Sequence, residues 1–326
     1  MSLNHSQTSR GVYRLAVVTS CCTVLLLMAG AMVTSNDAAD SVPDWPLAYH
    51  RWIPPLVGGI RFEYAHRVIA GLVALLTLVL AVWLTFAKEG LSSGRQGEPA
   101  RRVGPPAKCL GWLALILVLA QAGLGALRVE EIHPMVSAIA HATLAQIYFI
   151  TIVGLSLYLS PWWQRGLRKL DDSGSPRLRS LALWTTLAIL AQLILGAAFR
   201  HGAFGIDPHL VGAGVVTIMV VWVGRAARNR FAADPDLRRA TILLHSFFGL
   251  QVLLGLAAWW AVRVLAREFS QPTVLYVSLT VAHVLGGALT LAASVMLTLT
   301  CFRLIRSLSV GVKSAAHSAQ QAGAWR

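Results

Sequence analysis

Four histidines at regular intervals are the residues whose type and spacing most suggest chemistry. His66 and His209 are 143 residues apart, and His141 and His283 are 142 apart. Within each half the spacing is 75 residues, from His66 to His141, and 74 residues, from His209 to His283. Imidazole is the commonest metal-binding side chain, and four histidines at equivalent positions of a duplicated chain favour ligation over unrelated structural roles. The spacing therefore predicts two paired-histidine sites.

The number of donors limits which metal such a pair could hold. Zinc needs four nitrogen or sulfur ligands, or three and a water, and each half offers two histidines. A di-iron carboxylate site needs two Glu-x-x-His motifs, whereas the sequence has one, from Glu63 to His66. Two histidines facing each other in an apolar bundle match the two axial positions of a haem iron. Two bis-histidine haem sites are the simplest interpretation.

One carboxylate distinguishes the first pair from the second. Glu63 precedes His66 by three residues and shares its helical face, whereas the matching position before His209 is Ile206. A role in the reaction is one interpretation, as a proton carrier, as an orienting group or as a partner of His66. An interfacial anchor or an ion-pair partner for Arg67 is the other.

The elements that carry these residues must be membrane helices. The chain has 326 residues, and because 56% are hydrophobic and only 13% are charged, it is not a soluble domain with a polar shell. Eight stretches free of Asp, Glu, Lys and Arg are each long enough to cross a bilayer. They are 15–36, 68–87, 109–127, 132–164, 180–199, 208–224, 240–262 and 269–302. The predicted fold is all-α and integral to the lipid bilayer, with eight transmembrane helices.

The formal net charge of +14 indicates topology rather than nucleic-acid binding. Of the 28 basic residues, 21 lie before the first stretch, in alternate loops, or in the C-terminal tail. By the positive-inside rule both termini are predicted to be cytoplasmic. The first stretch ends in Ala29-Gly30-Ala31, which resembles a signal-peptidase site, but its length favours a retained helix.

The duplication defines the predicted domain organisation. Four helices per half return the chain to the same side, which gives parallel repeats and two four-helix bundles, at 1–170 and 171–326. Gln121, Gln192 and Gln251 each precede a glycine by four residues, on stretches where helices could approach closely. The matching tetrapeptides "ALRV" and "AVRV" make Arg128 and Arg263 candidate equivalents.

Several motifs resemble those of one family, the eight-helix haem A synthases. They are "PDWPL" (43–47), "IPPL" (53–56), "EYAHR" (63–67), "AHATLA" (140–145), "FRHGAFGIDPHLVGA" (199–213) and "AHVLGGALTLA" (282–292). The resemblance covers about residues 13 to 300, and its specific part is Glu-x-x-His followed by three correctly spaced histidines. It implies a membrane oxidoreductase that oxidises a ring methyl of haem O to the formyl group of haem A, for the assembly of terminal cytochrome oxidases.

The resemblance also implies how the sites are used. His66 and His141 would be the axial ligands of the substrate haem O, His209 and His283 would hold a resident haem B, and Glu63 would be catalytic. Haem propionates could be held by arginines near the histidine ends of the helices, or these arginines could simply lie at the membrane interface. The candidates are Arg67, Arg128, Arg200 and Arg263. The expected location is a bacterial inner membrane, with haem O synthase and oxidase assembly factors as candidate partners, while a homo-oligomer remains open.

The sequence departs from the family pattern in one loop. Many bacterial relatives have two cysteines flanking "PDWPL", where this chain has Val42 and Ala48. A thiol relay in that loop is therefore excluded here, and its role must be one of shape or docking. Two alternatives to the enzyme stay open: a non-catalytic di-haem b-type cytochrome, which does not need Glu63, and a transporter built from repeats.

Overall fold

The computed structural model describes residues 5–87, 104–129, 133–165 and 169–306, and in this part the named elements are all helices. Eight of them are long and apolar enough to cross a membrane, which confirms the predicted all-α integral membrane fold. The helices are α1 (His5–Ser35), α2 (Ile60–Phe86), α3 (Pro105–Val129), α4 (Pro134–Leu159), α5 (Leu178–Arg200), α6 (Asp207–Phe231), α7 (Pro235–Arg263), α8 (Leu265–Glu268) and α9 (Val274–Leu304).

Local signals fix where the helices begin. Proline occupies the first turn of α4, α6 and α7, where its missing N–H has no partner to lose. Asp234 caps α7 and Thr273 caps α9 through side-chain hydrogen bonds to the first backbone N–H groups. Helix α2 begins at Ile60, well before its charge-free stretch starts at Val68. Glu63, His66 and Arg67 therefore lie in the first two or so turns of a helix and not in a loop.

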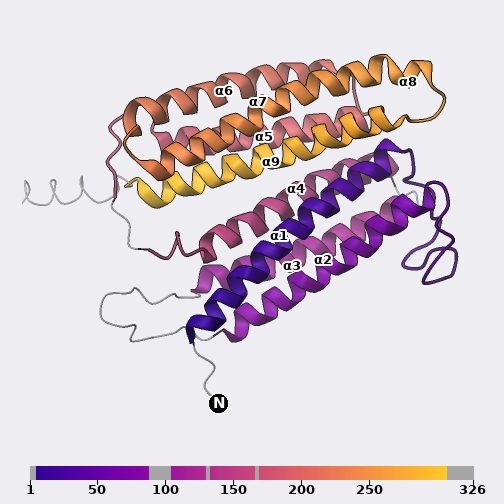
Figure 1. The fold of residues 1–326 in the computed structure, drawn as a ribbon, viewed down its shortest axis with the longest axis horizontal. Coiled ribbons are helices and arrows are strands. Elements are labelled where there is room, and N and C mark those ends of the chain that lie inside the picture. The colour runs from indigo at the N-terminus through magenta and orange to yellow at the C-terminus, as the bar shows by residue number, and fades with distance from the viewer. Residues whose placement is uncertain (1–4, 88–103, 130–132, 166–168, 307–326) are drawn as a thin grey trace, which may run out of the picture.

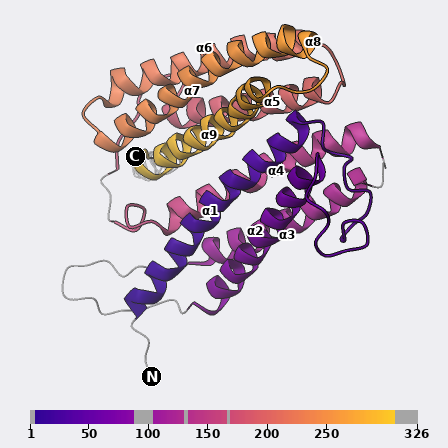
Figure 2. The same cartoon turned by 45° about the vertical axis from the view of Figure 1, so that its right-hand side comes forward.

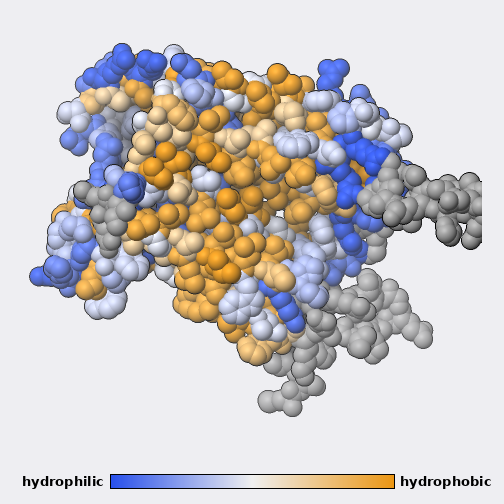
Figure 3. Space-filling view, turned by 180° about the vertical axis from the view of Figure 1, so that it is seen from behind, coloured by the Kyte–Doolittle hydropathy of each residue, from blue (hydrophilic) through white to orange (hydrophobic). Residues whose placement is uncertain are grey.

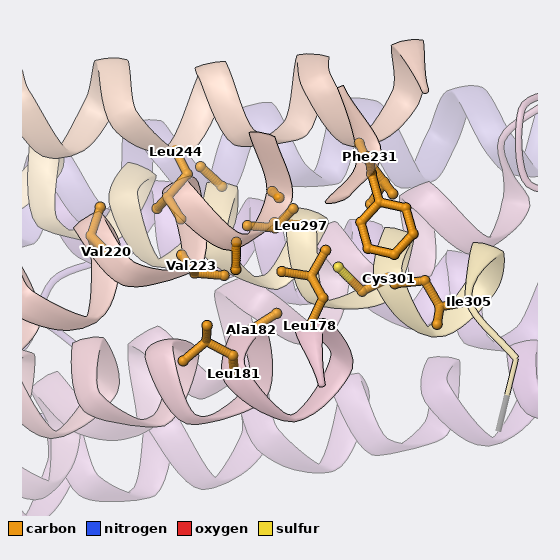
Figure 4. Packing of buried hydrophobic residues seen from close by; sticks show 14 of the residues in the cluster. Leu178, Leu181, Ala182, Val220, Val223, Phe231, Leu244, Leu297, Cys301 and Ile305 are labelled. Carbon is orange, nitrogen blue, oxygen red and sulfur yellow. The ribbon is translucent and has the colours of Figure 1, made fainter. Parts of the chain in front are cut away.

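The helices form two bundles that lie side by side (Figure 1). Helices α1 to α4 pack around one core that includes Leu80, Tyr148 and Ile152. Helices α5, α6, α7 and α9 pack around a second core, whose centre includes Leu244 and Leu297 (Figure 4). The turned view shows the same separation into two groups (Figure 2).

Helix α9 joins the two bundles and is the most buried of the long helices. Its small residues Ala288 and Ala292 face Phe149 of α4, which allows close approach of the helix backbones. Helix α9 also contacts α1, because the Thr280 hydroxyl of α9 lies 2.9 Å from the Ser35 hydroxyl of α1. Elsewhere apolar side chains cover the middle of the molecule and hydrophilic ones gather at its two ends, as expected for a protein surrounded by lipid (Figure 3).

The two bundles differ most in the connections at the histidine end, by which we mean the ends of α2, α4, α6 and α9 that carry the four histidines. Residues 36–59 form a long first loop between α1 and α2, whereas residues 201–206 suffice between α5 and α6. The short helix α8, which the sequence analysis did not predict, lies between α7 and α9. The first site therefore has a much longer chain segment beside it than the second.

Candidate functional site

The structure brings the four predicted histidines together as two pairs. His66 of α2 faces His141 of α4 with ring centroids 6.4 Å apart and ring planes at 70°. His209 of α6 faces His283 of α9 with centroids also 6.4 Å apart and planes at 86°. The same separation recurs in both bundles although the connecting loops differ. The two halves thus build the same pair from different helices.

This separation can be tested against a haem iron held by both rings. An imidazole nitrogen binds a first-row metal at about 2 Å and lies roughly 1.1 Å from its ring centroid, so two axial imidazoles on one iron have centroids roughly 6 Å apart. The observed 6.4 Å fits that arrangement in both pairs. Among the described residues no group of three or more His, Cys, Asp or Glu side chains converges as a further metal site.

A glycine of the neighbouring helix lies against each histidine ring. A Cβ added at Gly30, Gly196 or Gly255 would lie 3.1, 3.0 or 3.0 Å from Cε1 of His66, His209 or His283, respectively. At Gly125 the corresponding distance to Cε1 of His141 is 3.7 Å, which is ordinary contact. The first three glycines therefore provide space that a side chain would take from the ring. The Gln-x-x-x-Gly pattern in the sequence identified Gly125, Gly196 and Gly255. It did not identify Gly30, because the residue four positions before Gly30 is not glutamine.

The residue four positions before each glycine lies beside the same histidine ring. The backbone carbonyls of Leu26, Gln121, Gln192 and Gln251 lie beside the rings of His66, His141, His209 and His283. An imidazole that binds iron through Nε2 keeps its proton on Nδ1, and a carbonyl beside the ring is an acceptor that such a proton could use. The repeated Gln-x-x-x-Gly spacing thus marks a histidine support and not merely close helix packing.

The glutamine side chains distinguish the two pairs. In the second bundle the side-chain amide nitrogens of Gln192 and Gln251 each lie 3.1 Å from Nδ1 of their histidine, and that of Gln192 also donates a 2.9 Å bond to the His209 carbonyl. At Gln251 a rotated amide would present its oxygen to an Nδ1–H. In the first bundle Nδ1 of His66 and Nδ1 of His141 have no hydrogen-bond partner among the described residues. The second pair is therefore more completely held by the protein than the first.

Glu63 is buried, with 5% of its surface exposed, and its carboxylate is fully engaged. Its Oε1 accepts a 2.7 Å charge-assisted bond from Arg67, and its Oε2 accepts a 3.0 Å bond from the backbone N–H of Val42. Ion pairing with Arg67, which the sequence left open, is present. The terminal nitrogens of Arg67 also donate to the carbonyls of Val42, Asp44 and Leu47. Arg67 is thus directed at the first loop.

The other candidate arginines have different surroundings. Arg128 forms a 2.9 Å ion pair with Asp40 of the first loop. Arg200 donates a 2.7 Å bond to the Ser35 hydroxyl and so lies where the two bundles meet. The guanidinium of Arg263 lies 5.9 Å from the centre of the Trp259 ring. Gly125 and Gly255 are equivalent positions of the two bundles, because each lies against a histidine ring. Arg128 lies three residues after Gly125 but Arg263 lies eight residues after Gly255, so the predicted equivalence of the two arginines is wrong.

His201, which belongs to neither histidine pair, directly follows α5 and lies near enough to Arg200, Arg128 and His141 for their charges to act on it. Burial, with the positive charges of Arg200 and Arg128 and the ring of His141, lowers the pKa of His201 to about 4, so this ring is neutral at neutral pH. Its place beside His141, on the loop that follows Arg200, could not be read from the sequence because no spacing pattern includes it. The other described histidine ring in the spans, that of His245, is bonded to the Thr241 carbonyl.

Fold and site together define a class: an eight-helix membrane protein built as two bundles, each with a facing histidine pair suited to haem. The comparisons agree with this class. Residues 60–207 match the family described as "Cytochrome oxidase assembly protein". The chain is also similar to three proteins named heme A synthase. That of Symbiobacterium thermophilum is 25% identical over 71% of this chain and 80% of the relative. That of Alkalihalophilus pseudofirmus is 30% identical over 47% of this chain and 51% of the relative. That of an Exiguobacterium species is 29% identical over 55% of this chain and 54% of the relative, so this chain spans about half the length of these two relatives.

The chain is thus similar to haem A synthases over most of its length, and the family match itself covers residues 60–207.

Proposed function

We propose that the protein is a haem A synthase, a membrane oxidoreductase that converts a ring methyl of haem O to a formyl group. The observation that carries the proposal is the duplicated histidine pair, in which two rings stand at the spacing of axial haem ligands in each bundle. Similarity to proteins named heme A synthase supports the reaction. The difference between the bundles supports different uses of the two sites.

We assign His66 and His141 to the substrate haem O, and His209 and His283 to a resident haem B. The second pair suits a permanently bound group, because the amides of Gln192 and Gln251 reinforce its rings. Haem B supplies one-electron chemistry when bound. Nδ1 of each ring in the first pair has no such amide contact, and this pair adjoins the long first loop, features that suit a group which must arrive and leave.

The chain's own residues position the substrate and shield it. His66 and His141 hold the macrocycle between α2 and α4, and the apolar bundle keeps water from the oxidised carbon. Glu63 lies one helical turn before His66, and we retain it as a residue required for the reaction. Arg67, Arg128, Arg200 and Arg263 remain candidate propionate contacts, of which Arg67 is already engaged by Glu63 and the first loop.

We further propose the inner membrane of a bacterium, with both termini in the cytoplasm and the four histidines toward the opposite side. The distribution of basic residues supports this orientation. Haem O synthase and oxidase assembly factors are the proposed partners, since a hydrophobic substrate and product would pass between membrane proteins.

The proposal is tested by co-expressing the protein with a haem O producer and analysing the extracted pigments by mass. Formation of the formyl-bearing haem is expected, and a catalytically dead His66→Ala variant is the matched control. A protein that binds haem but yields no formyl product would instead be the non-catalytic di-haem cytochrome.

A further inference from the structure

The first loop carries a set of contacts that the second bundle lacks. We name residues 41–52 the strap. The strap follows Asp40, which pairs with Arg128 near the end of α3, and it returns to α2 through the Trp52 carbonyl, which accepts a 2.8 Å bond from the Tyr64 hydroxyl. It therefore runs beside the ends of α3 and α2, the helices that carry Gly125 and His66. Two internal features stiffen it.

The first stiffening feature is a turn closed by Asp44. Tyr49 and His50 both have left-handed backbone conformations, with φ of 54° and 58°, and their successive N–H groups converge. The Asp44 carboxylate accepts from both, at 2.6 and 2.7 Å, and these bonds, led by that from His50, lower the pKa of Asp44. The second feature is the Tyr49 hydroxyl, which donates to the Ser41 carbonyl at 2.9 Å.

The strap is bound to α2, the helix that carries His66, chiefly through Glu63 and Arg67. Arg67 donates to the carbonyls of Asp44 at 2.7 Å, Leu47 at 3.0 Å and Val42 at 3.3 Å. Glu63 receives the Val42 N–H and neutralises Arg67. Val42 and Ala48 are buried, with exposures of 1% and 2%, so the strap is seated on the bundle at these residues. A forked guanidinium is suited to collecting several acceptors at once.

The second bundle lacks both the strap and these charges. The residues matching Glu63 and Arg67 are Ile206 and Leu210, and only residues 201–206 separate α5 from α6. A buried ion pair gives little net stability by itself, because desolvation offsets the attraction, so its presence in one bundle alone calls for a local purpose. The purpose visible in the structure is to hold the strap.

We propose that Glu63 and Arg67 are positioning residues, a clasp that keeps the strap closed beside the His66–His141 pair. The inference rests on the proposed function in that the first site is the one where a substrate is exchanged. Closing the strap excludes water and fixes the end of α2, and releasing it opens the histidine end of the first bundle. On this account Glu63 acts through Arg67 and Val42, not on the reacting atoms.

Hydrogen exchange of the full-length, haem-loaded protein tests the clasp. Arg67→Ala should speed exchange of the strap amides roughly tenfold or more, as expected for loss of charge-assisted bonds. Arg67→Lys should behave nearly as badly, because an ammonium keeps the charge but not the fork. Arg61→Ala removes an exposed arginine of the same helix and should leave the strap protected. Unchanged strap exchange in Arg67→Ala would refute the clasp.

Haem O conversion in the same variants separates positioning from chemistry. Conversion should fall in step with strap protection, and Glu63→Gln combined with Arg67→Ala should be no worse than Arg67→Ala alone. The second-site haem spectrum should stay as in the wild type. If Glu63→Gln stops conversion while the strap stays fully protected, Glu63 acts on the reacting atoms and the clasp is not its role. Failure of the proposed function looks different, since the wild type would then make no haem A, while strap exchange still reports on the clasp.

Discussion

The two bundles share a scaffold and differ in what surrounds it. Each presents two imidazoles 6.4 Å apart, and each ring rests against a glycine of a neighbouring helix. The second pair has glutamine amides at Nδ1 and a short connection beside it, whereas the first has a long strap tied by an ion pair. The comparison shows that a duplicated frame can keep the geometry of the histidine pair while its surroundings differ, and we propose that this difference lets one copy retain a group and the other exchange it.

The largest expected effect comes from removing a ligand, and it should differ between the pairs. His209→Ala or His283→Ala should abolish the low-spin spectrum of the resident haem, because one axial position is lost. His66→Ala should lose haem O conversion first and keep the resident spectrum. Optical spectra and pigment analysis of the purified variants check this. Identical losses in His66→Ala and His283→Ala would remove the distinction between the sites.

Filling the space at the glycines should give the next largest effect. Gly196→Ala and Gly255→Ala place a methyl 3.0 Å from Cε1 of the facing ring, so the histidine must give by a few tenths of an ångström, and overpacking of this kind costs roughly 1–3 kcal/mol. Haem content and thermal unfolding of the purified protein would report this change. Gly125→Ala is the matched control, since its added methyl meets His141 at ordinary contact distance. Equal effects at all these positions would contradict the register described above.

Replacing the glutamines should make the second site more like the first. Gln251→Leu or Gln192→Leu removes the amide beside Nδ1 and introduces the side chain found at Leu26 in the first bundle. Loss of such a supporting partner typically weakens binding roughly 10- to 100-fold, so haem should be lost faster from these variants. Transfer of haem to apomyoglobin measures the rate. Gln121→Leu should change it little, because among the described residues Nδ1 of His141 has no hydrogen-bond partner for the substitution to remove.

The smallest effect is expected at the partly exposed Arg128–Asp40 pair. Exposed ion pairs contribute roughly 0–1 kcal/mol, so Asp40→Asn should barely alter stability. If Arg128 also contacts a propionate, Arg128→Ala should weaken haem O binding more than Asp40→Asn does. Haem O titration of the two variants compares them, and equal affinities would leave Arg128 with the loop contact alone.

Much of this arrangement could be predicted because it depends on features that recur along the sequence. Charge-free stretches gave the spanning helices, and equal histidine spacings in the two halves gave the pairs. The charge-free stretch 68–87 gave only part of α2, which begins at Ile60, because helices continue through charged residues once these can reach water or a partner. The short helix α8 carries no periodic signal long enough to detect.

The clasp was beyond the sequence for a different reason. Arg67 binds the carbonyls of Val42, Asp44 and Leu47, and backbone acceptors leave no trace in residue identity. The predicted equivalence of Arg128 and Arg263 was wrong because it rested on a four-residue match and not on the distance along the chain from each arginine to its glycine. Gly30 escaped because its supporting position holds Leu26 and not glutamine.

Electron paramagnetic resonance of the oxidised, haem-replete wild-type protein tests the central claim most directly. We expect a low-spin ferric signal from a six-coordinate haem held by two imidazoles, present in the His66→Ala variant and absent when either His209 or His283 is changed to alanine. A colourless preparation, or a high-spin signal that is indifferent to His209→Ala and His283→Ala, would contradict it.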